Sequence, residues 1–187
     1  MDARSTPTPT ANLDADAWIE AAFNALAEGG IDAVRVDPLA KQLGVTRGSF
    51  YWHFKDRAAL HAALLREWRT RASYLVFKRL VRSVESAADR LRRIFALPNS
   101  SPRATRAARI EMAIRFWAYR DKAAARAVRH IDNTRLRYFT TLFRQHGIAD
   151  DEAEGRAYLF YTALMAQAML TGDRKHAEFS EAFLLMS

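Results

Sequence analysis

The spacing of the apolar residues sets the narrowest limit on the fold of this chain. From residue 14 onward apolar residues recur every three or four positions, and no alternating run of apolar and polar residues stands out. This spacing gathers apolar side chains on one face of an α-helix, whereas a half-buried strand requires alternation. Because glycines and prolines divide the pattern, the sequence predicts an all-α protein of about nine helices. The first helix begins at Asp14 or Asp16 and ends at Gly29-Gly30, and the others are expected near residues 36–43, 47–53, 57–80, 84–97, 103–119, 121–146, 150–171 and 176–186.

Composition excludes several classes of protein. Hydrophobic residues make up 50% of the 187 positions, which is enough for a buried core in one long domain or two small ones. The chain has no cysteine, which excludes disulfides, a thiolate nucleophile and cysteine-bound zinc. Its five histidines include no pair four residues apart and no HExxH pattern. We therefore expect no metal and no other cofactor.

The N-terminus and the absence of a long apolar run bear on the compartment. Residues 1–13 are rich in Thr, Pro and Ala without periodicity, which predicts a flexible arm. They lack the apolar centre of a signal peptide, and no run in the chain reaches the ~18 apolar residues of a spanning helix. We expect a soluble cytoplasmic protein that has no membrane partner.

The chain is basic, but the excess charge is unevenly distributed. The formal net charge is +8, and residues 81–144 hold 15 Lys and Arg against 5 Asp and Glu. Residues 1–80 hold 11 against 9. A basic protein often has a nucleic-acid partner, although charge alone fits a solvated basic surface equally well. For residues 81–144 we favour a solvated arginine-rich face over a site for an anionic effector.

The segment from Val36 to Leu60 carries the clearest functional signal. Two short helical segments are separated by Gly44, which can adopt the positive φ that a tight turn requires. This arrangement is a helix-turn-helix signature. Phe50 and Phe54 fall on the inward face of the second segment and are predicted to anchor it to the core. The outward face carries polar and aromatic side chains suited to the DNA major groove, namely Thr46, Arg47, Ser49, Tyr51, Trp52 and His53.

The run GVTRGSFYWHFKDRAAL, which ends at Leu60, resembles the recognition region of the TetR family of bacterial transcriptional regulators. The resemblance covers about residues 14–65, and the rest of the chain is similar to the family only in length and helical style. It implies three parts. These are a flexible arm (1–13), a three-helix DNA-binding domain with the helix-turn-helix (14–56), and a helical domain for effector binding and dimerisation (57–187).

The resemblance also implies roles for individual residues. Arg47 and Ser49 match positions that read base edges, and an arginine can donate two hydrogen bonds to one guanine. Gly48 lies between them, where a missing side chain lets the backbone approach DNA. Trp52 matches a position at the wall of the groove. Phosphate contacts are implied for Thr46, Tyr51, His53, Lys55 and Arg57.

Four residues depart from the family pattern at the start of the first short helix. Family members usually cap this helix with Thr or Ser, where this chain has Arg35 and Val36. Arg35 can contact phosphate by its charge, but it is a weaker cap. Asp37 suits the helix dipole and would repel DNA if it faced it. Pro38 is also unusual at its position.

By the resemblance, the C-terminal domain binds a small molecule and forms a homodimer. Its aromatic, methionine and polar residues suit a pocket between helices, although each would also suit an ordinary core. Glu111 with Arg115 is predicted to be a structural ion pair, and Asp132 with Arg135 a second one. Pocket candidates are Met112, Arg115, Phe116, Tyr119, Asn133, Tyr138 and Tyr158. Dimer-interface candidates are Tyr161, Leu164, Met165, Ala168, Phe179 and Phe183.

These features predict a ligand-responsive regulator that binds double-stranded DNA as a homodimer. The simplest version is a repressor that a small molecule releases from a near-palindromic operator, while an activator remains open because the sign depends on operator position. One alternative is a dimeric helical module without sequence-specific DNA binding. An α-helical enzyme is disfavoured, because the sequence has no metal spacing, glycine-rich phosphate loop or triad-like cluster.

Overall fold

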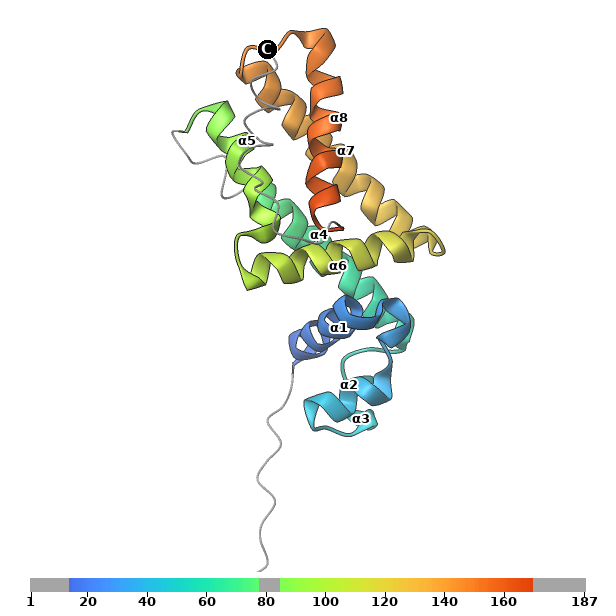
Figure 1. Cartoon of the computed structure of the whole chain (residues 1–187). Coiled ribbons are helices and arrows are strands. Elements are labelled where there is room, and N and C mark those ends of the chain that lie inside the picture. Colours follow the sequence, from blue (N-terminus) through green and yellow to red (C-terminus); the bar gives the residue numbers. More distant parts are fainter. Residues whose placement is uncertain (1–13, 78–84, 170–187) are drawn as a thin grey trace, which may run out of the picture. The chain divides into compact units, whose positions relative to one another are not determined.

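The computed structural model describes residues 14–77 and 85–169 of the chain (Figure 1). Within these ranges it contains eight α-helices, two short 3-10 helices and no strand, so the prediction of an all-α protein is confirmed. The predicted N-terminal arm and the predicted last helix, with Phe179 and Phe183, lie outside the described residues. The chain divides into two compact units, residues 1–64 and 65–187.

The first unit begins with α1 (Ala15–Gly29), whose ends are set by local signals. The Asp14 carboxylate caps the helix by accepting the Ala17 N–H at 2.9 Å. The helix ends where Gly30 takes a φ of +69°, and the Gly30 N–H donates to the Leu26 carbonyl. Trp18 and Leu26 are fully buried on its inner face. The predicted boundaries of this helix are confirmed.

The helix-turn-helix consists of α2 (Val36–Leu43) and α3 (Arg47–Tyr51). A 3-10 turn, η1 (Ile31–Ala33), precedes α2. Gly44 has a φ of +67° and ends α2, which confirms the predicted turn. Arg35 is at the cap position and its side chain makes no capping bond, as expected for the substitution of the usual Thr or Ser.

The helix α4 (Arg57–Phe77) starts at the predicted position. The Asp56 carboxylate accepts the Ala59 N–H at 2.8 Å, as expected for a helix cap. Leu60 and Leu64 of α4 are fully buried in the first unit. No helix in the described part of the chain is both long and apolar enough to span a bilayer.

The second unit is built around four further helices. They are α5 (Ala87–Ala96), α6 (Pro102–Ala118), α7 (Lys122–Gln145) and α8 (Asp150–Gln167), with the 3-10 turn η2 (Leu97–Asn99) after α5. Hydroxyl or carboxylate caps begin three of them, since Ser86, Ser101 and Asp121 each accept backbone N–H groups. Each helix lies within a few residues of its predicted range.

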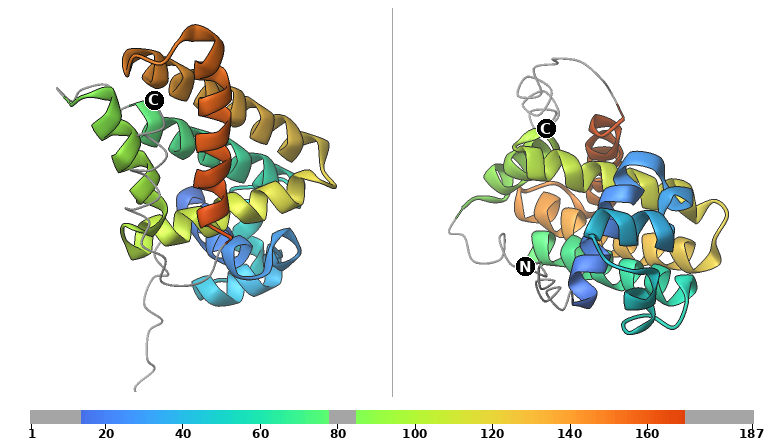
Figure 2. Two further views of the ribbon diagram at one scale, coloured as in Figure 1. Left: turned by 45° about the horizontal axis from the view of Figure 1, so that its top comes forward. Right: turned by 90° about the horizontal axis from the view of Figure 1, so that it is seen from below.

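The helix α7 is central to the second unit, because it contacts α5, α6 and α8 (Figure 2). Aromatic rings fill the space between α5, α7 and α8. Phe139 and Phe160 pack edge to face with ring centroids 5.1 Å apart, and Phe95 contacts Phe160 at 5.6 Å. This core positions the polar side chains of α6, α7 and α8 that are described below.

Candidate nucleic-acid interface

The buried side of α3 fixes the direction of its exposed side. Phe50 is fully buried and contacts Trp18, with ring centroids 5.3 Å apart, while Phe54 is 7% exposed. The prediction that these two phenylalanines anchor the helix to the core is confirmed. The opposite side presents Tyr51, 52% exposed, and Trp52, 88% exposed. Two large aromatic side chains on a surface are unusual unless they contact a partner.

The remaining interface candidates lie in the same unit. Thr46, Arg47, Gly48, Lys55 and Arg57 are exposed, whereas Ser49 and His53 are partly buried. Gly48 has an ordinary backbone conformation, and an added Cβ would meet only the Thr46 hydroxyl, at 3.6 Å. Nothing inside this unit therefore requires a glycine at position 48. The open space above it suits a partner that approaches the α3 backbone closely.

The side chain of Thr46 does not cap α3. It occupies the cap position of α3 with extended backbone angles, but its hydroxyl makes no capping bond. The Ser49 N–H instead donates to the Thr46 carbonyl at 3.0 Å. The first turn of α3 is thus closed by the backbone alone, and the hydroxyl is not used for this purpose.

Arg57 has a structural contact that the sequence did not indicate. Its Nη2 donates to the carbonyl of Ile31 at 3.0 Å, and its Nε donates to Nε2 of His61 at 3.2 Å. The first contact joins the start of α4 to η1. The guanidinium thus makes structural contacts within the unit, while the residue is also exposed at the predicted interface.

Arg47 is held from two sides. Its Nη2 donates to the Tyr51 hydroxyl at 3.3 Å, and its Nη1 lies 3.6 Å from Oδ1 of Asp37. The hydrogen bond to Tyr51 and the charge of Asp37 raise the pKa of Arg47. Asp37 thus lies on the same exposed surface as the predicted base-reading arginine, and pairs with it. Sequence reasoning placed both residues but did not pair them.

Comparison with known proteins agrees with this geometry. Residues 19–64 match the family model described as bacterial regulatory proteins of the tetR family. This N-terminal segment is thus similar in sequence to the TetR family. It is 41% identical over 54 residues to the tetracycline repressor protein class D of Escherichia coli, which is 29% of this chain and 25% of that protein. It is 45% identical over 47 residues to the regulator TtgR of Pseudomonas putida, 25% of this chain and 22% of that protein.

The similarity to the curated relatives ends with the TetR-family domain, which spans about a quarter of their length. The fold likeness extends further. A transcriptional regulator from Rhodococcus sp. Rha1 superposes with a TM-score of 0.74 and 22% identity, over 92% of each chain. At this identity the likeness concerns the fold. The fold of the chain is thus similar to that of this regulator.

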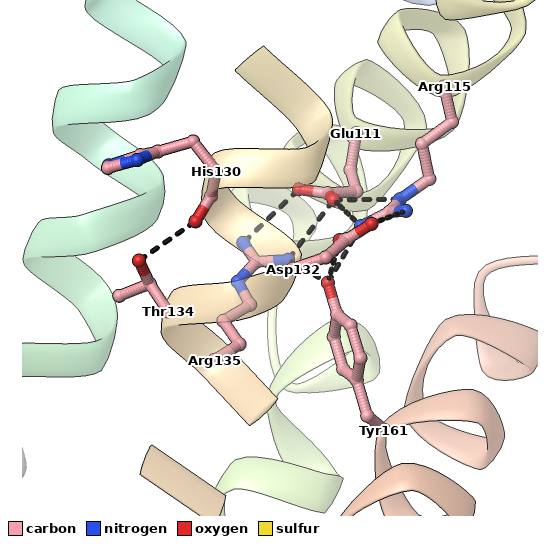
Figure 3. Close-up of polar contacts among 7 residues, drawn as sticks. All are labelled: Glu111, Arg115, His130, Asp132, Thr134, Arg135 and Tyr161. Atoms are coloured by element: carbon pink, nitrogen blue, oxygen red, sulfur yellow. Dashed lines mark hydrogen bonds and ion pairs between the residues drawn. The ribbon is translucent and has the colours of Figure 1, made fainter. Parts of the chain in front are cut away.

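Three helices of the second unit share a buried ionic network (Figure 3). On α6, Arg115 pairs with Glu111 of its own helix and, at 2.6 Å, with Asp132 of α7. Arg135 of α7 reaches back to Glu111, with both terminal nitrogens within 3.2 Å of the carboxylate. Tyr161 of α8 accepts from both arginines and donates to Asp132. Two cations and two anions are thereby paired around one hydroxyl.

The network shifts the ionisation of its members. Burial acts to raise the pKa of the Glu111 carboxyl, but the charges of Arg135 and Arg115 outweigh it and hold that pKa below its ordinary value. Burial raises the pKa of Tyr161 to about 12, despite the opposing charges of the two arginines. The Glu111 carboxylate is therefore ionised and the Tyr161 hydroxyl is a hydrogen-bond donor at neutral pH.

The predicted Asp132–Arg135 pair is wrong in detail. The Glu111–Arg115 pair forms as predicted, but Asp132 pairs with Arg115 and Arg135 pairs with Glu111, both across helices. Asp132 and Arg135 are three positions apart on α7, a spacing that allows a local pair. The packing of α6 against α7 offers each arginine a carboxylate on the other helix.

The pocket candidates differ in burial. Arg115 belongs to the ionic network, and Met112 and Tyr138 are partly buried. The other four are exposed on the described surface, because their side chains point out of the helical unit. These four are Phe116, Tyr119, Asn133 and Tyr158.

The dimer-interface candidates also differ in how deeply they are buried. Tyr161 and Leu164 are buried in the unit's own aromatic core, so their side chains point inward and not out of the chain. Met165 and Ala168 are partly exposed. The apolar residues that α8 and the turn after it expose are Tyr158, Leu159 and Met169. Among the described residues, no group of three or more His, Cys, Asp or Glu could hold a metal ion.

Proposed function

We propose that this protein is a cytoplasmic, homodimeric transcriptional regulator that binds a near-palindromic DNA operator and is released by a small molecule. One observation carries the proposal. A TetR-family helix-turn-helix presents Arg47, Tyr51 and Trp52 to solvent on a helix that Phe50 and Phe54 anchor from behind. A short, rigidly backed helix with polar and aromatic side chains outward fits the DNA major groove. The relatives that share this domain are named as regulators, and none as an enzyme.

DNA recognition would be divided among the exposed residues of the first unit. Arg47 and Ser49 would read base edges, with Gly48 allowing the backbone to come close to the bases. Trp52 would contact the wall of the groove. Contacts to phosphate would set the position of the helix without reading sequence. They are assigned to Thr46, Tyr51, His53, Lys55 and Arg57.

Two copies would bind one operator through pairing of their C-terminal helices. Tyr158 and Leu159 are exposed on α8, and Met169 is exposed in the turn that follows it. An exposed apolar face of this kind is a surface that a second copy can cover. The two recognition helices would then enter major grooves about 34 Å apart, one turn of DNA.

A small-molecule effector would act on the second unit. It lowers operator affinity only if it binds more tightly to the conformation that does not fit DNA, since equal affinity for both conformations shifts nothing. The helices α6, α7 and α8 are coupled by the buried network, so a ligand that separates any two of them acts on the third. Movement of these helices relative to one another would alter the spacing of the two recognition helices.

Selection of bound duplexes from a random DNA library, at near-physiological salt, tests the proposal directly. We expect recovery of a near-palindromic site with two half-sites about one helical turn apart. Searching the source genome for that site then identifies the controlled genes and the class of effector. Salt-sensitive binding without any sequence preference would contradict the proposed base readers and favour a helical module without specific DNA binding.

Arg47→Ala is expected to remove sequence reading at one base position. Loss of a bidentate contact to guanine lowers discrimination at that position by about tenfold to a hundredfold. Binding measured against operators with each base at every position should reveal a single relaxed position. An unchanged preference at every position would remove Arg47 from the set of base readers.

Lys55→Ala is expected to weaken binding to all DNA sequences alike. A lysine that neutralises one phosphate releases about one counterion, so the slope of log affinity against log salt should decrease by about 1. Titrations of specific and unrelated duplexes at salt concentrations between about 50 and 200 mM measure this slope. An unchanged slope, or a loss confined to the specific site, would contradict a phosphate contact.

A further inference from the structure

Asp37 is a carboxylate on the surface that the proposed function assigns to DNA. It lies in the first turn of α2, and its side chain is 69% exposed. A negative charge on such a surface repels the phosphate backbone and weakens binding to every sequence. Its Oδ1 lies 3.6 Å from Nη1 of Arg47. The carboxylate therefore acts on the residue proposed to read a base.

The geometry of Arg47 leaves it free to contact guanine while Asp37 and Tyr51 hold it. Each terminal nitrogen of a guanidinium carries two N–H groups. Nη1 lies 3.6 Å from Asp37 and Nη2 donates one N–H to the Tyr51 hydroxyl, so N–H groups remain on both nitrogens. Guanine presents two acceptors, O6 and N7, in the major groove, and an arginine binds them with two parallel hydrogen bonds.

Holding the guanidinium before DNA arrives reduces the loss of side-chain freedom on binding. An exposed arginine otherwise samples many rotamers and must be ordered when it contacts a base. Asp37 on α2 and Tyr51 on α3 approach the guanidinium from two helices, so its orientation depends on the helix-turn-helix geometry itself. Preorganisation of this kind strengthens the contact that needs the correct orientation, and not the contacts to phosphate.

We propose that Asp37 is a positioning residue that orients Arg47 toward a guanine, so that it raises sequence specificity while it lowers affinity for DNA in general. The proposal rests on the proposed function, because it requires DNA to meet this surface. It accounts for an exposed carboxylate on a surface that is proposed to meet phosphate. It also predicts that removing the Asp37 charge changes two quantities in opposite directions. Affinity for unrelated DNA should rise, and the preference for guanine should fall.

Asp37→Ala in the full chain separates these quantities. We expect affinity for unrelated duplexes to rise about twofold or more, because a repulsive charge is removed. The preference for guanine at the position read by Arg47 should fall by about two- to fivefold, as for loss of an exposed ion pair. Asp37→Asn, which keeps the size but not the charge, should give the same two changes. Preferences at all other positions should be unchanged.

Two further variants make the result specific. Glu28→Ala removes an exposed carboxylate from the last turn of α1 and changes the net charge equally, so the guanine preference should remain that of the wild type. In an Arg47→Ala background, Asp37→Ala should no longer alter any base preference. An increase in affinity that is equal for specific and unrelated DNA would overturn the positioning role. A wild-type protein without any sequence preference would overturn the proposed function itself.

Discussion

Phe50→Ala is expected to destabilise the first unit by about 3–5 kcal/mol, the range for removing a fully buried phenylalanine. The ring is completely enclosed and contacts Trp18 and Phe54, so its loss leaves a cavity between α1 and α3. Urea denaturation followed by circular dichroism measures the change. Because α3 loses its support, all DNA binding should be lost as well.

Trp52→Ala is the matched control for this experiment. Trp52 is two residues away and is 88% exposed, so its removal should change the free energy of unfolding by no more than about 0.5 kcal/mol. Operator binding should nevertheless weaken, because the side chain is proposed to contact the groove. A Trp52 variant as unstable as the Phe50 variant would contradict the assignment of inner and outer faces of α3.

Glu111→Ala is expected to destabilise the second unit by about 3–5 kcal/mol, the usual effect of breaking a buried ion pair from one side. The substitution leaves the buried guanidinium of Arg135 with no carboxylate partner among the contacts described, and Arg115 with Asp132 alone. The free energy of unfolding in urea at neutral pH measures the loss. Glu67→Ala removes the exposed pair with Arg71 and should cost only about 0.5 kcal/mol.

The same variant predicts a change in acid stability. The pKa of Glu111 is lower in the folded protein than its ordinary value of about 4.3, so its contribution to stability is complete above that pH. It is lost as the pH falls through the folded-state pKa. The difference in stability between wild type and Glu111→Ala should therefore shrink in acid. A difference that stays constant down to about pH 3 would contradict the role of the ionised carboxylate.

Local signals made the helix-turn-helix predictable. The positive φ of Gly44 and the inward spacing of Phe50 and Phe54 depend on residues within one or two helical turns. Their physical causes are therefore present in the sequence itself. The start of α4 at its Asp56 cap was predictable for the same reason.

Contacts between helices could not be predicted in this way. Glu111 and Arg135 are 24 residues apart, and Arg57 and Ile31 are 26 apart, so only the packing of the helices brings them together. The exposure of Phe116 and Tyr158 was missed for a related reason. An aromatic residue at helical spacing fits a core or a surface equally well, and the neighbouring helices decide between them.

The cross-pairing of Glu111 with Arg135, and of Arg115 with Asp132, gives α6 and α7 a preferred register. Sliding one helix past the other by a full turn, about 5.4 Å, would break both pairs simultaneously and strand four charges in a poorly hydrated space. The two pairs together therefore oppose displacement of α6 along α7. The register of these two helices thus depends on charge pairing that neither helix can supply alone.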